Sequence, residues 1–174
     1  MKRIVVLSLL LVCVLPSLVS ATAKDDFTLS VSLVIGERSR DSHAETTLIR
    51  LAGNNLTYER TYSGAGAGRR EPVRREFKLK GSEIARLKSL VKEKNLLGSG
   101  GLNFKPAAGQ LTYFEMNIRV TLKGIISTQE LSGPRAATNI KEERVYQKSM
   151  ALLQELYRLI NLREQGINYE EPVS

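Results

Sequence analysis

The single histidine lies in the only stretch of the chain where acid, hydroxyl and imidazole groups are adjacent. Asp41, Ser42, His43 and Glu45 fall within a short polar stretch. Residues two apart share a side of an extended chain, so Asp41, His43 and Glu45 would point the same way. A hydrolytic triad instead draws its nucleophile, base and acid from separate segments. We interpret the stretch as a solvated loop entering a strand, with a weak metal site as the alternative.

Two other patterns match parts of known motifs. Ser89 and Lys92 have the S-x-x-K spacing of penicillin-recognising enzymes, but the companion S-D-N and K-T-G elements are absent. Two glycine groups, at 64–68 and 98–101, lack the strand-to-helix context that a phosphate-binding loop needs. A further anion-binding candidate, Gly133-Pro134-Arg135, precedes a predicted helix whose first turn is acidic, so we interpret it as a loop.

The strongest signal in the sequence is a basic segment. Residues 69–94 contain ten Lys or Arg and four Asp or Glu, a net charge of +6. Residues 24–174 as a whole also carry +6, so the rest of that stretch is neutral. Clustered like charge attracts anions, and a merely solubilising face is the alternative. We select as candidate anion- or partner-binding residues Arg69, Arg70, Arg74, Lys78, Lys80, Lys88 and Lys92.

Residues 1–23 have the pattern of a secretory signal peptide. Lys2 and Arg3 precede an apolar run at 4–15, and small residues follow it, with Ala21 and Ala23 at the candidate cleavage sites. The run is shorter than the about 20 residues of a membrane-spanning helix. An uncleaved anchor is the alternative. We therefore expect a secreted or periplasmic protein whose mature chain lacks the single cysteine, Cys13.

The remaining chain predicts one α+β domain at 24–164, followed by a flexible tail at 165–174. Its apolar content of 42% and charged content of 25% are those of a globular domain. Alternation and helical periodicity predict strands at 27–35, 45–51, 56–62, 73–79, 111–122 and 125–131 and helices at 82–94 and 140–162. Asn139 and Glu142 fit a capping box for the second helix.

These elements, in the order β-β-β-β-α-β-β-α, predict an antiparallel sheet built from hairpins. The turn residues Gly53-Asn54-Asn55 and Lys123-Gly124 join adjacent strands. Because no strand–helix–strand alternation is present, we expect both helices to pack on one face of the sheet.

One resemblance follows from the element order between Leu56 and Ile160. The glycine-rich connection at 64–68 leads to an Arg-rich strand, then to the helix Glu83-x-x-x-Leu87-x-x-Leu90-Val91, a strand led by Tyr113 and a C-terminal helix. This order resembles that of emfourin-type small inhibitors of metallopeptidases. The chain differs in its leader, its extra N-terminal strand and its lack of a tight double-glycine hairpin. No functional residue is carried over.

The sequence therefore predicts a non-enzymatic binding domain without a cofactor. One His and one Cys cannot supply a zinc site of His and Cys ligands, an iron–sulfur centre or a disulfide. The expected partner is an anionic envelope component or an acidic protein. Nucleic acid is disfavoured by the predicted export and because Phe77, the one aromatic residue of the basic segment, has a core pattern. A secreted peptidase inhibitor is the second hypothesis and a hydrolase the third.

Overall fold

The computed structural model describes residues 26–38, 42–65, 67–98, 100–104, 111–136, 138–164 and 171–173. The predicted signal peptide with Ala21 and Ala23 lies outside these residues, as does Asp41. The strands are β1 (Thr28–Glu37), β2 (His43–Ala52), β3 (Asn55–Gly64), β4 (Val73–Lys78), β5 (Gly100–Asn103), β6 (Thr112–Leu122) and β7 (Ile125–Pro134). The helices are α1 (Gly81–Glu93) and α2 (Arg144–Asn161), with short 3₁₀ turns at Ala67–Arg69 and Thr138–Glu142.

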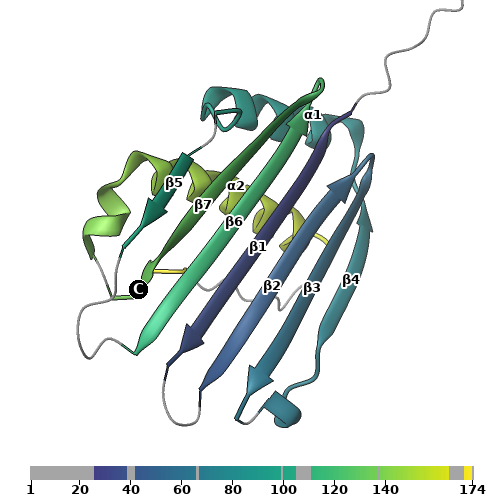
Figure 1. The fold of residues 1–174 in the computed structure, drawn as a ribbon. Helices are drawn as coiled ribbons and strands as arrows, with labels where there is room; N and C mark the ends of the chain where they lie inside the picture. Colours follow the sequence, from purple (N-terminus) through teal and green to yellow (C-terminus); the bar gives the residue numbers. More distant parts are fainter. Residues whose placement is uncertain are drawn as a thin grey trace, which may run out of the picture.

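The described strands form one sheet in the order β4-β3-β2-β1-β6-β7-β5. Every neighbouring pair is antiparallel except β5 and β7, which run parallel. Both helices lie behind the same face of this sheet (Figure 1). The predicted α+β class is confirmed. Strand β5 was not among the predicted strands.

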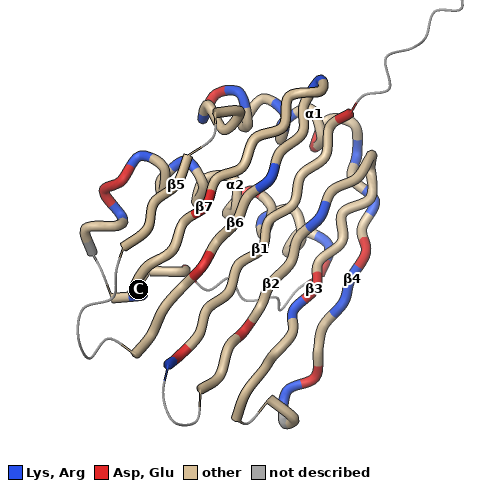
Figure 2. Tube along the Cα trace, viewed as in Figure 1, with Lys and Arg blue, Asp and Glu red and all other residues tan. Residues whose placement is uncertain are grey.

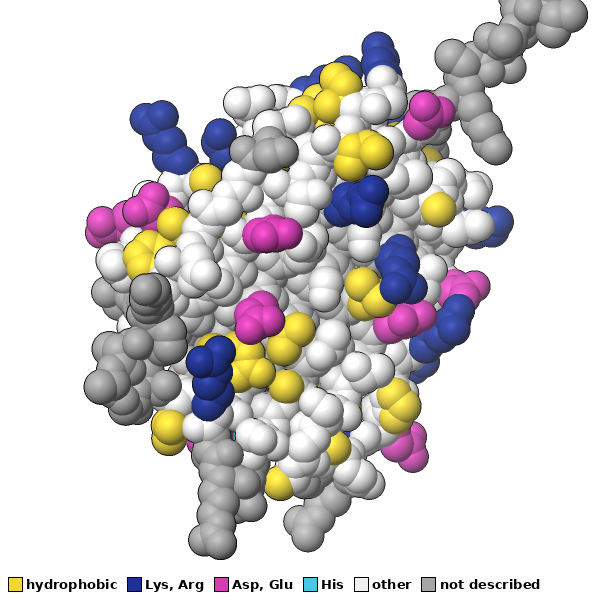
Figure 3. Space-filling view, in the orientation of Figure 1, with side chains coloured by type: hydrophobic (Ala, Val, Ile, Leu, Met, Phe, Trp, Pro, Cys, Tyr) yellow, Lys and Arg dark blue, Asp and Glu magenta, His cyan; other side chains and the backbone are white. Residues whose placement is uncertain are grey.

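Strand alternation gives the sheet one buried and one open face. In β1, Leu29, Val31 and Leu33 are buried against the helices, whereas Ser30 and Ser32 are only partly covered on the other side. The same alternation separates Ile118 from Arg119 in β6. The open face carries neutral polar side chains, scattered charges and separate hydrophobic side chains (Figure 3). The buried apolar residues of the described chain therefore form one core, on the helix side of the sheet.

Helix α2 provides most of the cover. Of its 18 residues, ten are buried, and they include Leu152, Leu153 and Leu156. Its aromatic rings meet the strands edge to face: Tyr157 and Tyr58 have centroids 6.1 Å apart, and Tyr146 and Phe114 6.3 Å. Burial raises the pKa of the Tyr58 and Tyr146 hydroxyls above their usual range. Helix and sheet thus share one apolar layer.

A hairpin turn and a helix end have residues that tolerate the left-handed backbone conformation found there. Lys123 (φ 52°) and Gly124 (φ 76°) form the two-residue turn between β6 and β7, and both occupy the left-handed region that such turns require. Asn95 (φ 50°) lies two residues beyond the end of α1, and its neighbour Leu96 donates its N–H to the Val91 carbonyl. These positions were correctly predicted as a hairpin turn and a helix end.

The start of α2 and the C-terminal residues differ from the prediction. The capping box at Asn139 and Glu142 does not form. Those residues belong to a 3₁₀ turn, and α2 begins at Arg144 with Glu143 as its N-cap. The fully buried Ile140 anchors this turn over Gly133. Of the predicted tail, residues 165–170 and 174 lie outside the described part of the chain, whereas Val173 is buried in the core.

Candidate functional site

Helix α1 crosses one end of the sheet, which we call the α1 end. The N–H of Leu79, just before α1, donates to the Asn54 carbonyl in the β2–β3 turn at 2.8 Å. Midway along the helix, Lys88 Nζ lies 5.6 Å from the centroid of the Phe27 ring, beside the start of β1. Beyond the helix, Ser127 Oγ of β7 donates to the Gly98 carbonyl at 2.8 Å. The helix therefore spans the sheet from β3 to β7.

Lysines gather at this end, on α1, on the residues before and after it and on the β6–β7 turn (Figure 2). They are Lys78, Lys80, Lys88, Lys92, Lys94 and Lys123. Apart from Lys88, which contacts Phe27, none of them forms a salt bridge with another described residue. The exposed acidic side chains nearby are those of Asp26 and Glu93. The α1 end therefore carries a net positive charge that ion pairs within the described chain do not cancel.

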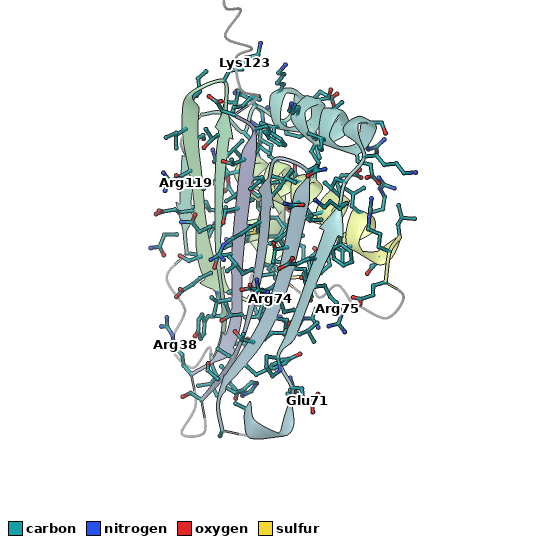
Figure 4. All side chains as sticks on the ribbon, turned by 90° about the vertical axis from the view of Figure 1, so that its right-hand side faces the viewer. Arg38, Glu71, Arg74, Arg75, Arg119 and Lys123 are labelled. Carbon is teal, nitrogen blue, oxygen red and sulfur yellow. The ribbon has the colours of Figure 1, made fainter. Side chains whose placement is uncertain are left out.

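The arginines of the basic segment are arranged differently, because three of them pair with carboxylates. Arg74 Nη2 lies 3.0 Å from Glu76, and its Nε lies 3.6 Å from Glu59. Arg75 pairs with Glu164, which lies beyond α2. Figure 4 shows Arg74 and Arg75 midway along the β4 edge, with Arg75 turned toward the helices. By strand alternation, Arg75 shares the side of β4 that carries Val73 and Phe77.

Arg86 of α1 also pairs with a carboxylate, that of the buried Glu155. Its Nε lies 2.8 Å from Glu155 Oε1, and the same carboxylate accepts two hydrogen bonds from Arg158, at 2.7 and 2.8 Å. Hydrogen bonds from Arg158, aided by the charge of Arg86, outweigh desolvation and hold the pKa of Glu155 below its usual value. Glu83 at the start of α1 pairs with Arg163 at 2.6 Å. These arginines connect α1 and β4 to α2.

The predicted binding set is therefore divided by the fold. Lys78, Lys80, Lys88 and Lys92 come together at the α1 end, but Arg74 lies midway along the sheet edge. Lys80 lies beyond the end of β4 and is the N-cap of α1. Arg69 and Arg70 belong to the opposite end, where β3 finishes.

Two lysines that the prediction did not select complete the cluster. Lys94 was counted in the basic segment and follows α1 directly, whereas Lys123 comes from the β6–β7 turn, well outside that segment. Figure 4 places Lys123 at the end of the sheet opposite Glu71. The predicted Lys123-Gly124 turn was the available signal for Lys123, because a turn residue must lie at an end of the sheet.

Apolar side chains accompany the lysines. Ile125 and Ile126 follow the Lys123-Gly124 turn and are 52% and 57% exposed. Ile125 pairs with Leu122 and Ile126 with Thr121, so the two side chains point to opposite faces of the hairpin tip. Exposed isoleucines on both faces of one hairpin tip, beside the gathered lysines, form a surface that is both cationic and apolar.

The other sequence candidates do not assemble a catalytic set within the described residues. His43 Nδ1 lies 3.6 Å from Glu37, whereas Glu45 pairs with Arg60 at 3.1 Å. Ser89 and Lys92 are exposed positions on α1. No group of three or more His, Cys, Asp or Glu side chains among the described residues is placed to hold a metal ion. None of the helices described here is long and apolar enough to cross a membrane.

Comparisons with known proteins add no assignment. No protein-family model matches the chain, and no curated protein matches it.

Proposed function

We propose that the protein is an exported, non-enzymatic domain that docks on an anionic surface of the cell envelope through its α1 end. The observation that carries the proposal is the gathering of lysines with the exposed pair Ile125 and Ile126 at a single end of the molecule. Lysines provide attraction to negative headgroups, and exposed aliphatic side chains provide an apolar contact. The two features together favour a lipid surface over a soluble acidic partner.

The expected strength follows from the number of charges. A lysine close to an anionic bilayer contributes about 1 kcal/mol, and this contribution disappears within a Debye length, about 10 Å at 0.1 M salt and about 3 Å at 1 M. Several lysines acting together therefore give binding that is reversible and steeply dependent on salt. The paired arginines contribute less, because their charges are already balanced by Glu76, Glu155 and Glu164.

Vesicle co-sedimentation tests the proposal. We expect the purified protein to bind phosphatidylglycerol-containing vesicles at low salt, to be released by 1 M salt, and to ignore neutral phosphatidylcholine vesicles. The triple change Lys78→Gln, Lys92→Gln and Lys123→Gln removes three lysines that make no salt bridge with a described residue. It should reduce binding at least tenfold, since three lost contributions of about 1 kcal/mol exceed the roughly 1.4 kcal/mol that a tenfold change requires.

The matched control removes the same charge elsewhere. Arg38, Arg70 and Arg144 are exposed, and none forms an ion pair with a described residue. The triple change of these residues to Gln should leave binding within about twofold of wild type. If both triple variants bind equally, net charge alone explains the attraction and the α1 end is not a docking surface. If the wild-type protein binds no anionic vesicle at low salt, the proposal fails.

Export is the second part of the proposal, and it rests on the pattern of residues 1–23. Mass spectrometry of the protein from the extracytoplasmic fraction should find Lys24 or Thr22 as the first residue. A protein that retains Met1 and stays in the cytoplasm would contradict this part.

A further inference from the structure

A second candidate site lies at the end of the sheet opposite α1, on the helix side. A hollow of about 480 Å³ opens there between the end of β3, the start of β2 and the segment that follows β7. Its volume falls within the range of small-molecule sites, about 300–1,000 Å³. We call it the Arg70 pocket after the residue that stands at its β3 side.

Two arginines reach this pocket from distant parts of the sheet. Arg70 follows β3 and Arg135 follows β7, two strands that β2, β1 and β6 separate. The Arg70 guanidinium stacks 5.3 Å from the centroid of the Tyr62 ring and forms no ion pair with a described carboxylate. Arg135 is half-buried and donates to the main-chain oxygen of Glu171 at 3.4 Å. Both cations therefore border the same space.

The acidic group in the wall does not cancel this charge. Glu45 lines the pocket, but its carboxylate lies 3.1 Å from Arg60, and the Glu45 and Arg60 side chains are only 17% and 14% exposed. The pair is neutral as a unit. His43, also in the wall, lies 3.6 Å from Glu37. The positive charge that the pocket offers to a ligand is therefore that of Arg70, which lies outside the neutral Glu45–Arg60 pair.

The other residues that line the Arg70 pocket suit a ligand with a small apolar part. Ile35, Ala44, Ala65 and Ala67 provide apolar surface, and the hydroxyl-bearing Tyr62 and Ser63 stand beside them. A guanidinium offers two parallel N–H groups that match the two oxygens of a carboxylate or phosphate. We propose that the Arg70 pocket binds a small organic oxyanion, a carboxylate or phosphate ester with a short apolar body, with Arg70 contacting the anionic group and Arg135 bordering the same space.

Three related probes test this proposal by NMR titration of the purified protein. Benzoate and phenyl phosphate share one apolar body and carry the two candidate anionic groups, while benzamide is the neutral analogue of benzoate. Titration to about 10 mM detects a Kd of about 1 mM. We expect at least one of the two anions to shift the amide signals of Ser63, Ala65 and Ala67, and benzamide to leave them unchanged. The anion that binds identifies the ligand class.

Substitutions distinguish binding in the Arg70 pocket from a general effect of net charge. Arg70→Gln should weaken the binding about tenfold, and Arg70→Lys, which keeps the charge but loses the planar fork, should weaken it less. Arg74→Gln, at an exposed residue on the sheet edge outside the pocket, should have no effect. An unchanged thermal midpoint shows that each variant is folded. If Arg70→Gln proves unstable, Arg70→Lys and the comparison of benzoate with benzamide still decide the proposal.

Three results would overturn it: no shift with either anion, equal shifts with benzamide, or anion-induced shifts confined to the α1 end. Because the two sites lie at opposite ends, the test is independent of the vesicle experiment. The triple change at Lys78, Lys92 and Lys123 should leave oxyanion binding intact, and Arg70→Gln should leave vesicle binding intact.

Discussion

The basic segment contains two kinds of cation that the fold treats differently. Arg74 meets Glu76 along the exposed β4 edge, and Arg75 and Arg86 meet carboxylates at the junction of β4, α1 and α2. Lys78 and Lys92 lie at the α1 end, where no described carboxylate pairs with them. This difference agrees with the chemistry of the two side chains, since the guanidinium fork suits fixed ion pairs and the ammonium suits hydrated contacts. Only some of the cations in a charged segment are therefore available to a partner.

The largest contrast in stability should separate the buried face of the sheet from its open face. Ile118→Ala removes a fully buried side chain from the centre of β6 and should cost about 2–5 kcal/mol of unfolding free energy. Arg119→Ala changes the next residue, which is exposed on the open face, and should cost less than about 0.5 kcal/mol. Urea denaturation measures both. Equal losses would mean that the assigned faces of β6 are wrong.

A smaller loss of unfolding free energy is expected at Glu155, the carboxylate that Arg86 and Arg158 share. Glu155→Gln keeps the shape of the buried side chain but removes the charge that Arg86 and Arg158 share, and it should cost about 1–3 kcal/mol at pH 7. The folded pKa of Glu155 is lowered, so its stabilising effect is present above the unfolded value of about 4.3. The effect is lost as the pH falls through the folded pKa.

Urea denaturation of wild type and Glu155→Gln between pH 7 and pH 3 checks this sign. The difference in unfolding free energy should be greatest near neutral pH and shrink in acid. A difference that stays constant or grows as the pH falls would contradict the role assigned to Glu155.

The smallest effect on stability should come from the lysines. The triple change Lys78→Gln, Lys92→Gln and Lys123→Gln removes exposed charges and should alter unfolding free energy by no more than about 0.5 kcal/mol per site. The change should be most favourable at low salt, because removing like charges relieves their mutual repulsion, and this gain should shrink as added salt screens the charges. A loss comparable to that of Glu155→Gln would show that these lysines hold the fold together, which would remove the contrast with the arginines.

The sequence predicted the elements that local pattern determines. Period-two alternation identified β6, and helical spacing identified α1 to within one residue at each end. Strand β5 was missed because its residues, Gly-Gly-Leu-Asn, have loop chemistry. Its strand conformation comes from parallel pairing with β7. The start of α2 was misplaced because the buried Ile140, a tertiary contact, fixes a 3₁₀ turn where a capping box was expected.

The candidate site was predictable only in part, for a related reason. The charge count located the basic segment, but it could not show which cations would be paired. The partner of Arg75 is Glu164, which lies beyond α2, and the partner of Arg86 is Glu155, which lies within that helix. Both partners are far from the basic segment in the sequence. Lys123 joins the other lysines only because the sheet places the β6–β7 turn beside α1. The Arg70 pocket likewise depends on the arrival of Arg135 from a distant strand.

Site-specific fluorescence tests the central claim, that the α1 end faces the membrane, most directly. The only cysteine, Cys13, lies in the leader proposed to be removed on export, so in the mature protein one introduced cysteine takes an environment-sensitive label. A label at Ile126→Cys, on the hairpin tip, should shift to the blue when phosphatidylglycerol vesicles are added, and 1 M salt should reverse the shift. A label at Ser63→Cys, at the opposite end, should not respond. A response at Ser63 without one at Ile126 would contradict the account.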